Sequence, residues 1–171
     1  MPVQRLNHAV LYVRDVDKSV QFYMDNLGFR IKFHVPGRAG FLLAPGSSND
    51  HDLGLFQIGD RALPSDAGSR TVGLYHLAWE VDTLAELKRL RKVLLDSGSL
   101  VGESDHSTTK ALYAKDPDGI EFEVCWILPA DLVTEEVLEK GVGVAPLDLD
   151  MEIERYGAET RGLLAGAAAV R

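Results

Sequence analysis

Two copies of one short pattern, 68 positions apart, limit what this chain can fold into. NHAVLYV at residues 7–13 resembles YHLAWEV at residues 75–81, and each copy places a histidine at the start of an apolar run. His8 and His76 therefore occupy equivalent places. An internal repeat on this scale indicates two modules that share one architecture.

The same order of predicted elements follows each copy. A helical pattern comes first, over 15–28 and over 82–98, and each ends near a glycine after starting at a polar capping residue. Asp15 or Asp17 is the candidate first cap, and Asp82 or Thr83 the second. Two sets of apolar residues at helical spacing should face the core: Val20, Phe22, Tyr23 and Leu27, then Leu84, Leu87, Leu90 and Leu94. Three strand candidates follow each helix: 29–35, 39–45 and 51–59, then 99–104, 111–116 and 120–126.

This order predicts an α+β fold in which two βαβββ modules pair into one curved, cupped mixed β-sheet with the helices outside. We place one domain at residues 1–127, with module one at 3–61 and module two at 71–127. Residues 62–70 are small, polar and turn-prone, which is typical of a linker.

Residues 128–171 repeat nothing and are predicted to form a C-terminal helical extension. One short helix should start at Pro129, a second should lie within 147–166, and the alanine-rich end at 167–170 is expected to fray. We expect this extension to dock onto the body of the protein or onto a partner subunit.

Composition narrows the class of protein. Hydrophobic residues make up 46% and charged residues 26%, as in soluble globular proteins, and we expect neither a secretion signal nor a membrane span. The net charge of -8 disfavours nucleic-acid and anionic-membrane partners. Cys125 is the single cysteine, so no intrachain disulfide can form, and a cytoplasmic location is expected.

The repeat also suggests a metal site. Imidazole binds iron, zinc, nickel and manganese, and His8 and His76 would face each other if the two modules form one sheet. Glu123 lies on an alternating strand near the end of module two, where a buried carboxylate needs a partner. Taken singly, a strand histidine is more often a core or surface residue, and Glu123 could face solvent.

The chain resembles the vicinal oxygen chelate superfamily over about residues 3–127. In that family the metal ligands lie on the first strand of each half and on the last strand of the second half, which implies His8, His76 and Glu123 here. The Asp-Pro-Asp-Gly turn at 116–119, followed by a glutamate four residues after its glycine, is also typical.

Within the superfamily, glyoxalase I uses a fourth ligand on the last strand of its first half. The offset of 68 maps Glu123 onto Leu55, which cannot bind a metal, although Gln57 could serve if the alignment shifts by two residues. Three ligands leave coordination positions open, as in the two-histidine, one-carboxylate triad of non-haem Fe(II) oxygenases.

The chain is most similar to the extradiol dioxygenase branch. The segment 50–56 resembles that branch's segment with its acid–base histidine, which implies this role for His51, with Asp50 in place of the branch's first histidine. A second signature of the branch runs from His106 to Glu123. Ser104, two residues before that histidine, is not one of the residues usual at its position in the signature. His34 matches no functional position of the branch. The second signature is carried by His106, Leu112, Tyr113, Asp116, Pro117, Gly119 and Glu123.

The resemblance implies an extradiol ring-cleaving dioxygenase that acts on a catecholic diol with O2, in a homodimer. Fe(II) or Mn(II) is the implied metal, with Ni(II) or Zn(II) if the protein is glyoxalase-like. His51 would move a proton, and His106 and Tyr113 would hydrogen-bond the substrate. Phe41 and Phe56 could form an aromatic wall with Trp79, although core positions are their commoner role. The alternatives are a glyoxalase I-like lyase or isomerase, a resistance-type metal-dependent thiol transferase, and a metal-free drug-binding protein.

Overall fold

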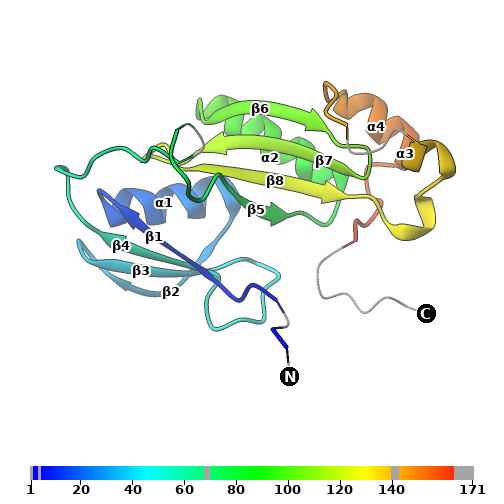
Figure 1. Cartoon of the computed structure of the whole chain (residues 1–171). Helices are drawn as coiled ribbons and strands as arrows, with labels where there is room; N and C mark the ends of the chain where they lie inside the picture. Colours follow the sequence, from blue (N-terminus) through cyan, green and yellow to red (C-terminus); the bar gives the residue numbers. More distant parts are fainter. Residues whose placement is uncertain (1, 4, 68–69, 140–142, 164–171) are drawn as a thin grey trace. The chain divides into compact units, whose positions relative to one another are not determined.

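The computed structural model describes residues 2–3, 5–67, 70–139 and 143–163. It divides into two compact units (Figure 1). Unit 1 contains Met1–Asp66 together with Asp116–Ile120, and unit 2 contains Ala67–Lys115 together with Glu121–Arg171. Unit 1 contains the predicted module one, and unit 2 contains module two except for Asp116–Ile120, which belong to unit 1.

Unit 1 contains a four-stranded mixed sheet and one helix. The sheet order is β1-β4-β3-β2, with β1 and β4 parallel and the other neighbours antiparallel. A parallel neighbour requires a crossover, and the chain makes it through the helix and the intervening strands. The elements are β1 (Ala9–Val13), α1 (Val16–Leu27), β2 (Arg30–Val35), β3 (Ala39–Leu43) and β4 (Leu53–Gln57).

Helix α1 starts and ends at two of the expected residues. The Asp15 side chain accepts a hydrogen bond from the Lys18 amide at 3.0 Å, and Gly28 closes the helix at a φ of 73°, which favours glycine. Its buried face differs in part from the prediction, because Phe22 and Leu27 are only half-buried whereas Ser19 and Asn26 are buried. The helix packs closely against β3 at Val20, since a Cβ on Gly40 would lie 2.6 Å from a Val20 methyl.

Unit 2 repeats this topology with the sheet order β5-β8-β7-β6. Thr83 caps α2, and the four leucines predicted to form its inner face are all buried. The predicted α+β class and the βαβββ order of each module are confirmed, and the pairing of the two sheets into one cup stays a prediction. The elements are β5 (Leu77–Glu80), α2 (Leu84–Asp96), β6 (Leu100–Asp105), β7 (Thr109–Lys115) and β8 (Glu121–Ile127).

Strand register shows how closely the two sheets correspond. Each sheet has one register irregularity at the matching ladder. In unit 1 it lies in the β2–β3 ladder between Ile31 and Phe33, and in unit 2 it lies in the β6–β7 ladder between Leu100 and Gly102. One cross-strand row in each sheet starts two residues after the repeated histidine. These rows are Val10, Gly54, Phe41 and Phe33 in unit 1, and Ala78, Glu123, Tyr113 and Gly102 in unit 2.

The Asp-Pro-Asp-Gly turn belongs to unit 1. The Asp116 carboxylate accepts hydrogen bonds from the amides of Asp118 and Ile120, each at 2.9 Å, and from the Tyr23 hydroxyl at 3.3 Å. Asp118 forms an ion pair with Arg14 at 2.9 Å. The turn is therefore held by side chains of unit 1 as well as by its own geometry.

The C-terminal extension is part of unit 2. The helix expected from Pro129 is split into a 3-10 turn, η1 (Ala130–Leu132), and α3 (Glu135–Glu139). The second helix, α4 (Leu149–Tyr156), is shorter than predicted because Gly157 ends it, and α4 contacts α2. The predicted fraying end lies outside the described residues.

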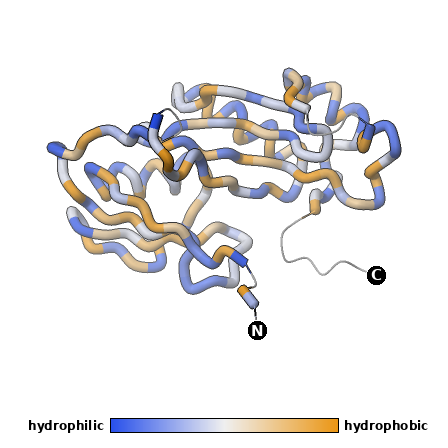
Figure 2. The backbone as a smooth tube through the Cα atoms, viewed as in Figure 1, coloured by the Kyte–Doolittle hydropathy of each residue, from blue (hydrophilic) through white to orange (hydrophobic). Residues whose placement is uncertain are grey.

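Hydrophobic and hydrophilic positions are interleaved along the elements (Figure 2). No helix within the described part of the chain is long and apolar enough to cross a membrane.

Candidate functional site

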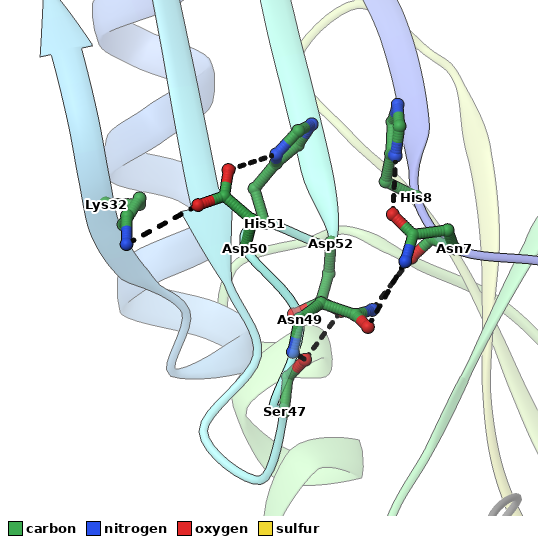
Figure 3. A network of polar contacts seen from close by, with 8 residues as sticks. All are labelled: Asn7, His8, Lys32, Ser47, Asn49, Asp50, His51 and Asp52. Carbon is green, nitrogen blue, oxygen red and sulfur yellow. Dashed lines mark hydrogen bonds and ion pairs between the residues drawn. The ribbon is translucent and has the colours of Figure 1, made fainter.

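His8 and His51 lie next to each other in unit 1. His8 immediately precedes β1 and His51 stands two residues before β4, so the parallel pairing of these strands brings both histidines to the same edge of the sheet. Their ring centroids are 4.4 Å apart (Figure 3). Two of the predicted site residues are thus brought together from distant parts of the sequence.

A polar neighbour orients each of these rings. His8 Nδ1 lies 2.9 Å from Asn7 Oδ1, and His51 Nδ1 lies 3.1 Å from Asp50 Oδ2 (Figure 3). Both oxygens accept, so each Nδ1 carries the hydrogen and each neutral ring keeps its lone pair on Nε2. This is the arrangement of a metal ligand or a proton acceptor. The hydrogen bond from His51, followed by the charge of Lys32, lowers the pKa of the Asp50 carboxyl.

Asp52 fixes the loop that carries His51. Its buried carboxylate accepts from the Ala44 amide at 2.9 Å, the Ser47 hydroxyl at 2.8 Å and the Asn49 side-chain amide at 2.7 Å. Asn49 also donates to the Asn7 carbonyl at 2.8 Å (Figure 3). The residues before β1 and before β4 are therefore tied together by hydrogen bonds as well as by the strand ladder.

His76 and Glu123 form the corresponding pair in unit 2. His76 immediately precedes β5, and its Nε2 lies 3.1 Å from Oε2 of Glu123 on β8. Glu123 is only 9% exposed, so its carboxylate needs a partner. His76 Nδ1 is buried and has no hydrogen-bond partner among the described residues.

His106 and Tyr113 form a second pair in unit 2. His106 Nε2 lies 2.9 Å from the Tyr113 hydroxyl, and its Nδ1 lies 3.2 Å from the Gly143 carbonyl oxygen. A carbonyl only accepts, so Nδ1 carries the hydrogen, and in the neutral ring Tyr113 donates to Nε2. Burial, and then the charge of Glu123, raise the pKa of Tyr113 to about 12, so its hydroxyl is protonated at neutral pH.

These side chains border a cavity of about 520 Å³ in unit 2. His106, Tyr113 and Glu123 line it together with residues of the following loop and of α3. A cavity of this size, with a few convergent polar groups and apolar walls, is typical of small-molecule sites.

Comparison with known proteins identifies the family. The sequence model of the Glyoxalase/Bleomycin resistance protein/Dioxygenase superfamily matches residues 5–124. The chain belongs to this superfamily. The resemblance seen in the sequence is thereby confirmed.

Two curated relatives in this superfamily carry dioxygenase names. The chain is 31% identical over 119 residues to the catechol-2,3-dioxygenase of Bacillus subtilis, a match that covers 70% of the chain and 40% of the relative. It is 33% identical over 116 residues to biphenyl-2,3-diol 1,2-dioxygenase 3 of Rhodococcus globerulus, covering 67% of the chain and 59% of the relative. The chain thus spans less than two thirds of the length of either relative.

Solved structures support the superfamily fold. A glyoxylase/bleomycin resistance protein/dioxygenase domain from Frankia has a TM-score of 0.58 and 24% identity, over 72% of this chain and 98% of that one. The lactoylglutathione lyase of Agrobacterium tumefaciens has a TM-score of 0.54 and 23% identity, over 73% and 95%. The same fold therefore carries proteins with different names.

The superfamily's metal ligands divide between the units. Unit 1 holds His8, unit 2 holds His76 and Glu123, and among the described residues no group of three or more potential ligands could hold a metal ion. The three-ligand set therefore stays a prediction. The donors do fit a divalent metal, because imidazole and carboxylate suit Fe(II) and because His76 Nδ1 is a buried nitrogen that lacks a partner in the described part of the chain.

The register corrects the position assigned to a fourth ligand. Glu123 pairs with Ala78, two residues after His76, and Gly54 pairs with Val10, two residues after His8. The counterpart of Glu123 is therefore Gly54 and not Leu55, and it has no side chain to bind a metal. Gln57, the alternative, is already engaged, since its side-chain oxygen accepts from the Val16 amide at 3.0 Å.

Several residues of the site were not predicted. Asp50 orients His51, and its position beside that histidine was the available signal. Gly143 contacts His106 from 37 residues away, and no sequence signal indicates this. Phe41, in contrast, was a candidate for an aromatic wall, and it packs edge-on against His51 with ring centroids 5.2 Å apart. His34 binds Asp17 at 2.7 Å, in agreement with a structural role.

Proposed function

We propose that the protein is an extradiol ring-cleaving dioxygenase that acts on a catecholic diol with O2. The observation that carries this proposal is the His106–Tyr113 hydrogen bond beside a cavity that Glu123 also lines. A polar pair that can hydrogen-bond a diol thus stands next to a predicted metal ligand. The dioxygenase names of the two curated relatives support the same reaction class.

Fe(II) would be held by His8, His76 and Glu123. When bound, it would supply coordination for the two diol oxygens and for O2, and it would lower the pKa of the bound hydroxyls. The remaining residues then have to bind the diol, orient it and move its protons.

Tyr113 and His106 would position the substrate. The Tyr113 hydroxyl keeps its proton at neutral pH and donates it to His106 Nε2, so its oxygen can accept a hydrogen bond from a diol hydroxyl. His106 would hold that hydroxyl in place, because the Gly143 carbonyl fixes the orientation of its ring. His51 has a free Nε2 lone pair, so it would accept the proton of a diol hydroxyl and return it later.

Oxygen consumption tests this proposal. The full chain is reconstituted with Fe(II) without oxygen, a catechol is added, and oxygen uptake and the ring-opened product are measured together. We expect one O2 consumed for each diol cleaved. No uptake with any catechol, combined with nickel- or zinc-dependent turnover of a hemithioacetal, would instead establish a glyoxalase-type reaction.

Gly54 disfavours that second reaction. A fourth protein ligand is expected in glyoxalase I, and the structural counterpart of Glu123 in unit 1 carries no side chain. The homodimer is proposed on the family resemblance alone, and sedimentation analysis of the full chain tests it.

A further inference from the structure

A short helix of the C-terminal extension forms an apolar border of the cavity. Val137 and Leu138 of α3 line the same cavity as His106 and Tyr113. Val137 is buried, whereas Leu138 is 63% exposed. A single exposed leucine is ordinary on a protein surface, but this one borders a space that already contains hydrogen-bonding groups.

Helix α3 is held in this place by the loop that carries His106. Five residues are too few for a stable isolated helix, so contacts outside it must fix its position. The Ser107 hydroxyl donates to the Val137 carbonyl at 2.5 Å, and Ser107 has a φ of 68°, the single positive φ found at a non-glycine residue within the described ranges. Strain of this kind persists where surrounding contacts enforce it.

A second attachment follows α3 in the chain. Asp105 and Ala145 exchange two backbone hydrogen bonds of 2.8 and 3.0 Å, and the Asp105 carboxylate accepts from the Ser107 amide at 2.8 Å. The loop at His106 is therefore joined to the extension both at α3 and beyond it. This makes α3 a fixed border of the cavity.

The cavity has room for more than one aromatic ring. A cavity of about 150 Å³ accommodates benzene, and this one measures about 520 Å³. Its polar lining suits the two hydroxyls of a diol, and its apolar lining on α3 suits a hydrocarbon substituent.

We propose that Leu138 is a specificity-determining residue, which contacts an apolar substituent on the ring of the diol. This proposal rests on the proposed function and extends it, because it predicts that an aryl-substituted catechol is preferred over catechol itself. The side chain supplies apolar surface that only the substituted diol covers.

The test compares Leu138→Asp with Leu95→Asp, which changes a leucine of α2 that is 49% exposed and does not line the cavity. Dissociation constants for catechol and 3-phenylcatechol are measured anaerobically on the Fe(II)-reconstituted chain, and kcat/KM is measured by oxygen uptake. We expect Leu138→Asp to weaken binding and kcat/KM for 3-phenylcatechol by at least about tenfold, with less than about a twofold change for catechol. Leu95→Asp should change neither diol by more than about twofold.

The outcomes separate this proposal from the proposed function. Equal effects of Leu138→Asp on both diols, or no effect on either, would overturn the role of Leu138 while the wild-type oxygen uptake still supports a dioxygenase. Selective loss of 3-phenylcatechol binding without oxygen uptake by the wild type would support the apolar border and overturn the dioxygenase. A wild-type chain that binds neither diol would overturn both.

Discussion

The two units share a topology and a strand register but differ in the chemistry of one row. In unit 1 the row contains Val10, Gly54 and Phe41, and Phe33 at its end is 58% exposed. In unit 2 the matching positions include Glu123 and Tyr113, next to each other on β8 and β7. The histidine before the first strand is kept in both units. The two units therefore keep the histidine before the first strand, while in this row only unit 2 has a carboxylate and a phenol.

The units also support their second histidines differently. In unit 1, His51 is oriented by its sequence neighbour Asp50. In unit 2, His106 is oriented by Gly143, which belongs to the C-terminal extension and has no counterpart in the repeat. The first arrangement is local in sequence, whereas the second depends on the docking of a non-repeated segment.

Replacing His51 should produce the largest change in activity. His51→Ala removes the proposed proton acceptor of unit 1, so we expect kcat for diol cleavage to fall by about 10²–10⁴-fold while Fe(II) stays bound. Oxygen uptake and iron content are measured on the same sample. His34→Ala, in the same unit, should leave both within about twofold. Loss of iron in His51→Ala would make this residue a ligand and would break the division of roles between the histidines.

Replacing Lys110 of unit 2 should lower the free energy of unfolding more than replacing Arg14 of unit 1. The buried Nζ of Lys110 lies 2.5 Å from Asp105 Oδ1 and 2.9 Å from Oε2 of Glu152 on α4. The contact with Glu152 is an ion pair that lacks the geometry of a hydrogen bond. Lys110→Met would leave the buried Glu152 carboxylate and the half-buried Asp105 carboxylate without their shared cation, so we expect the free energy of unfolding to fall by about 3–5 kcal/mol in urea titrations. Arg14→Met, which breaks the more exposed ion pair with Asp118 in unit 1, should cost only about 1 kcal/mol.

A control variant sharpens this stability comparison. Combining Lys110→Met with Asp105→Asn and Glu152→Gln removes both unpaired charges and should recover a large part of the loss. An effect of Lys110→Met no larger than that of Arg14→Met would show that the buried cluster does not anchor the extension.

Replacing Tyr113 should give the smallest effect, a change in how the free energy of unfolding depends on alkaline pH. Its pKa is raised to about 12, so between pH 10 and pH 12 the folded chain keeps a proton that the unfolded chain has lost. By linkage, the free energy of unfolding must fall as pH rises through this range. Tyr113→Phe should reduce that fall, as measured by urea unfolding at pH 9 and pH 11.

Cys125 provides the comparison for this pH effect, because burial raises its pKa to about 12 as well. Tyr113→Phe should therefore leave a residual alkaline loss, which Cys125→Ala reduces further. An unchanged pH dependence in both variants would contradict the raised pKa values.

Much of the fold was predictable because helices and strands have distinct periodicities. The four leucines of α2 and the caps at Asp15 and Thr83 follow from local patterns. The inner face of α1 was predicted less well, since Ser19 and Asn26 are buried where apolar spacing favoured Phe22 and Leu27.

The site was predictable to the extent that it follows the repeat. His8 and His76 lie where the repeat placed them, directly before β1 and β5. The counterpart of Glu123 was wrong by one residue, because a sequence offset measured at the first strands does not fix the register of the last ones. The contact from Gly143 to His106 could not be predicted, since it joins a non-repeated segment to the sheet.

Under the proposed function, the equivalent histidines of the two units and Glu123 hold one metal ion. The most direct test is the amount of Fe(II) bound per chain after anaerobic reconstitution, measured for the wild type and for His8→Ala, His76→Ala, Glu123→Ala and the control His34→Ala. We predict about one iron per chain in the wild type and in the control, and at least a tenfold weaker affinity in each of the other three variants. Full iron binding by His8→Ala, with the other two variants impaired, would show that unit 1 contributes no ligand and would contradict the claim.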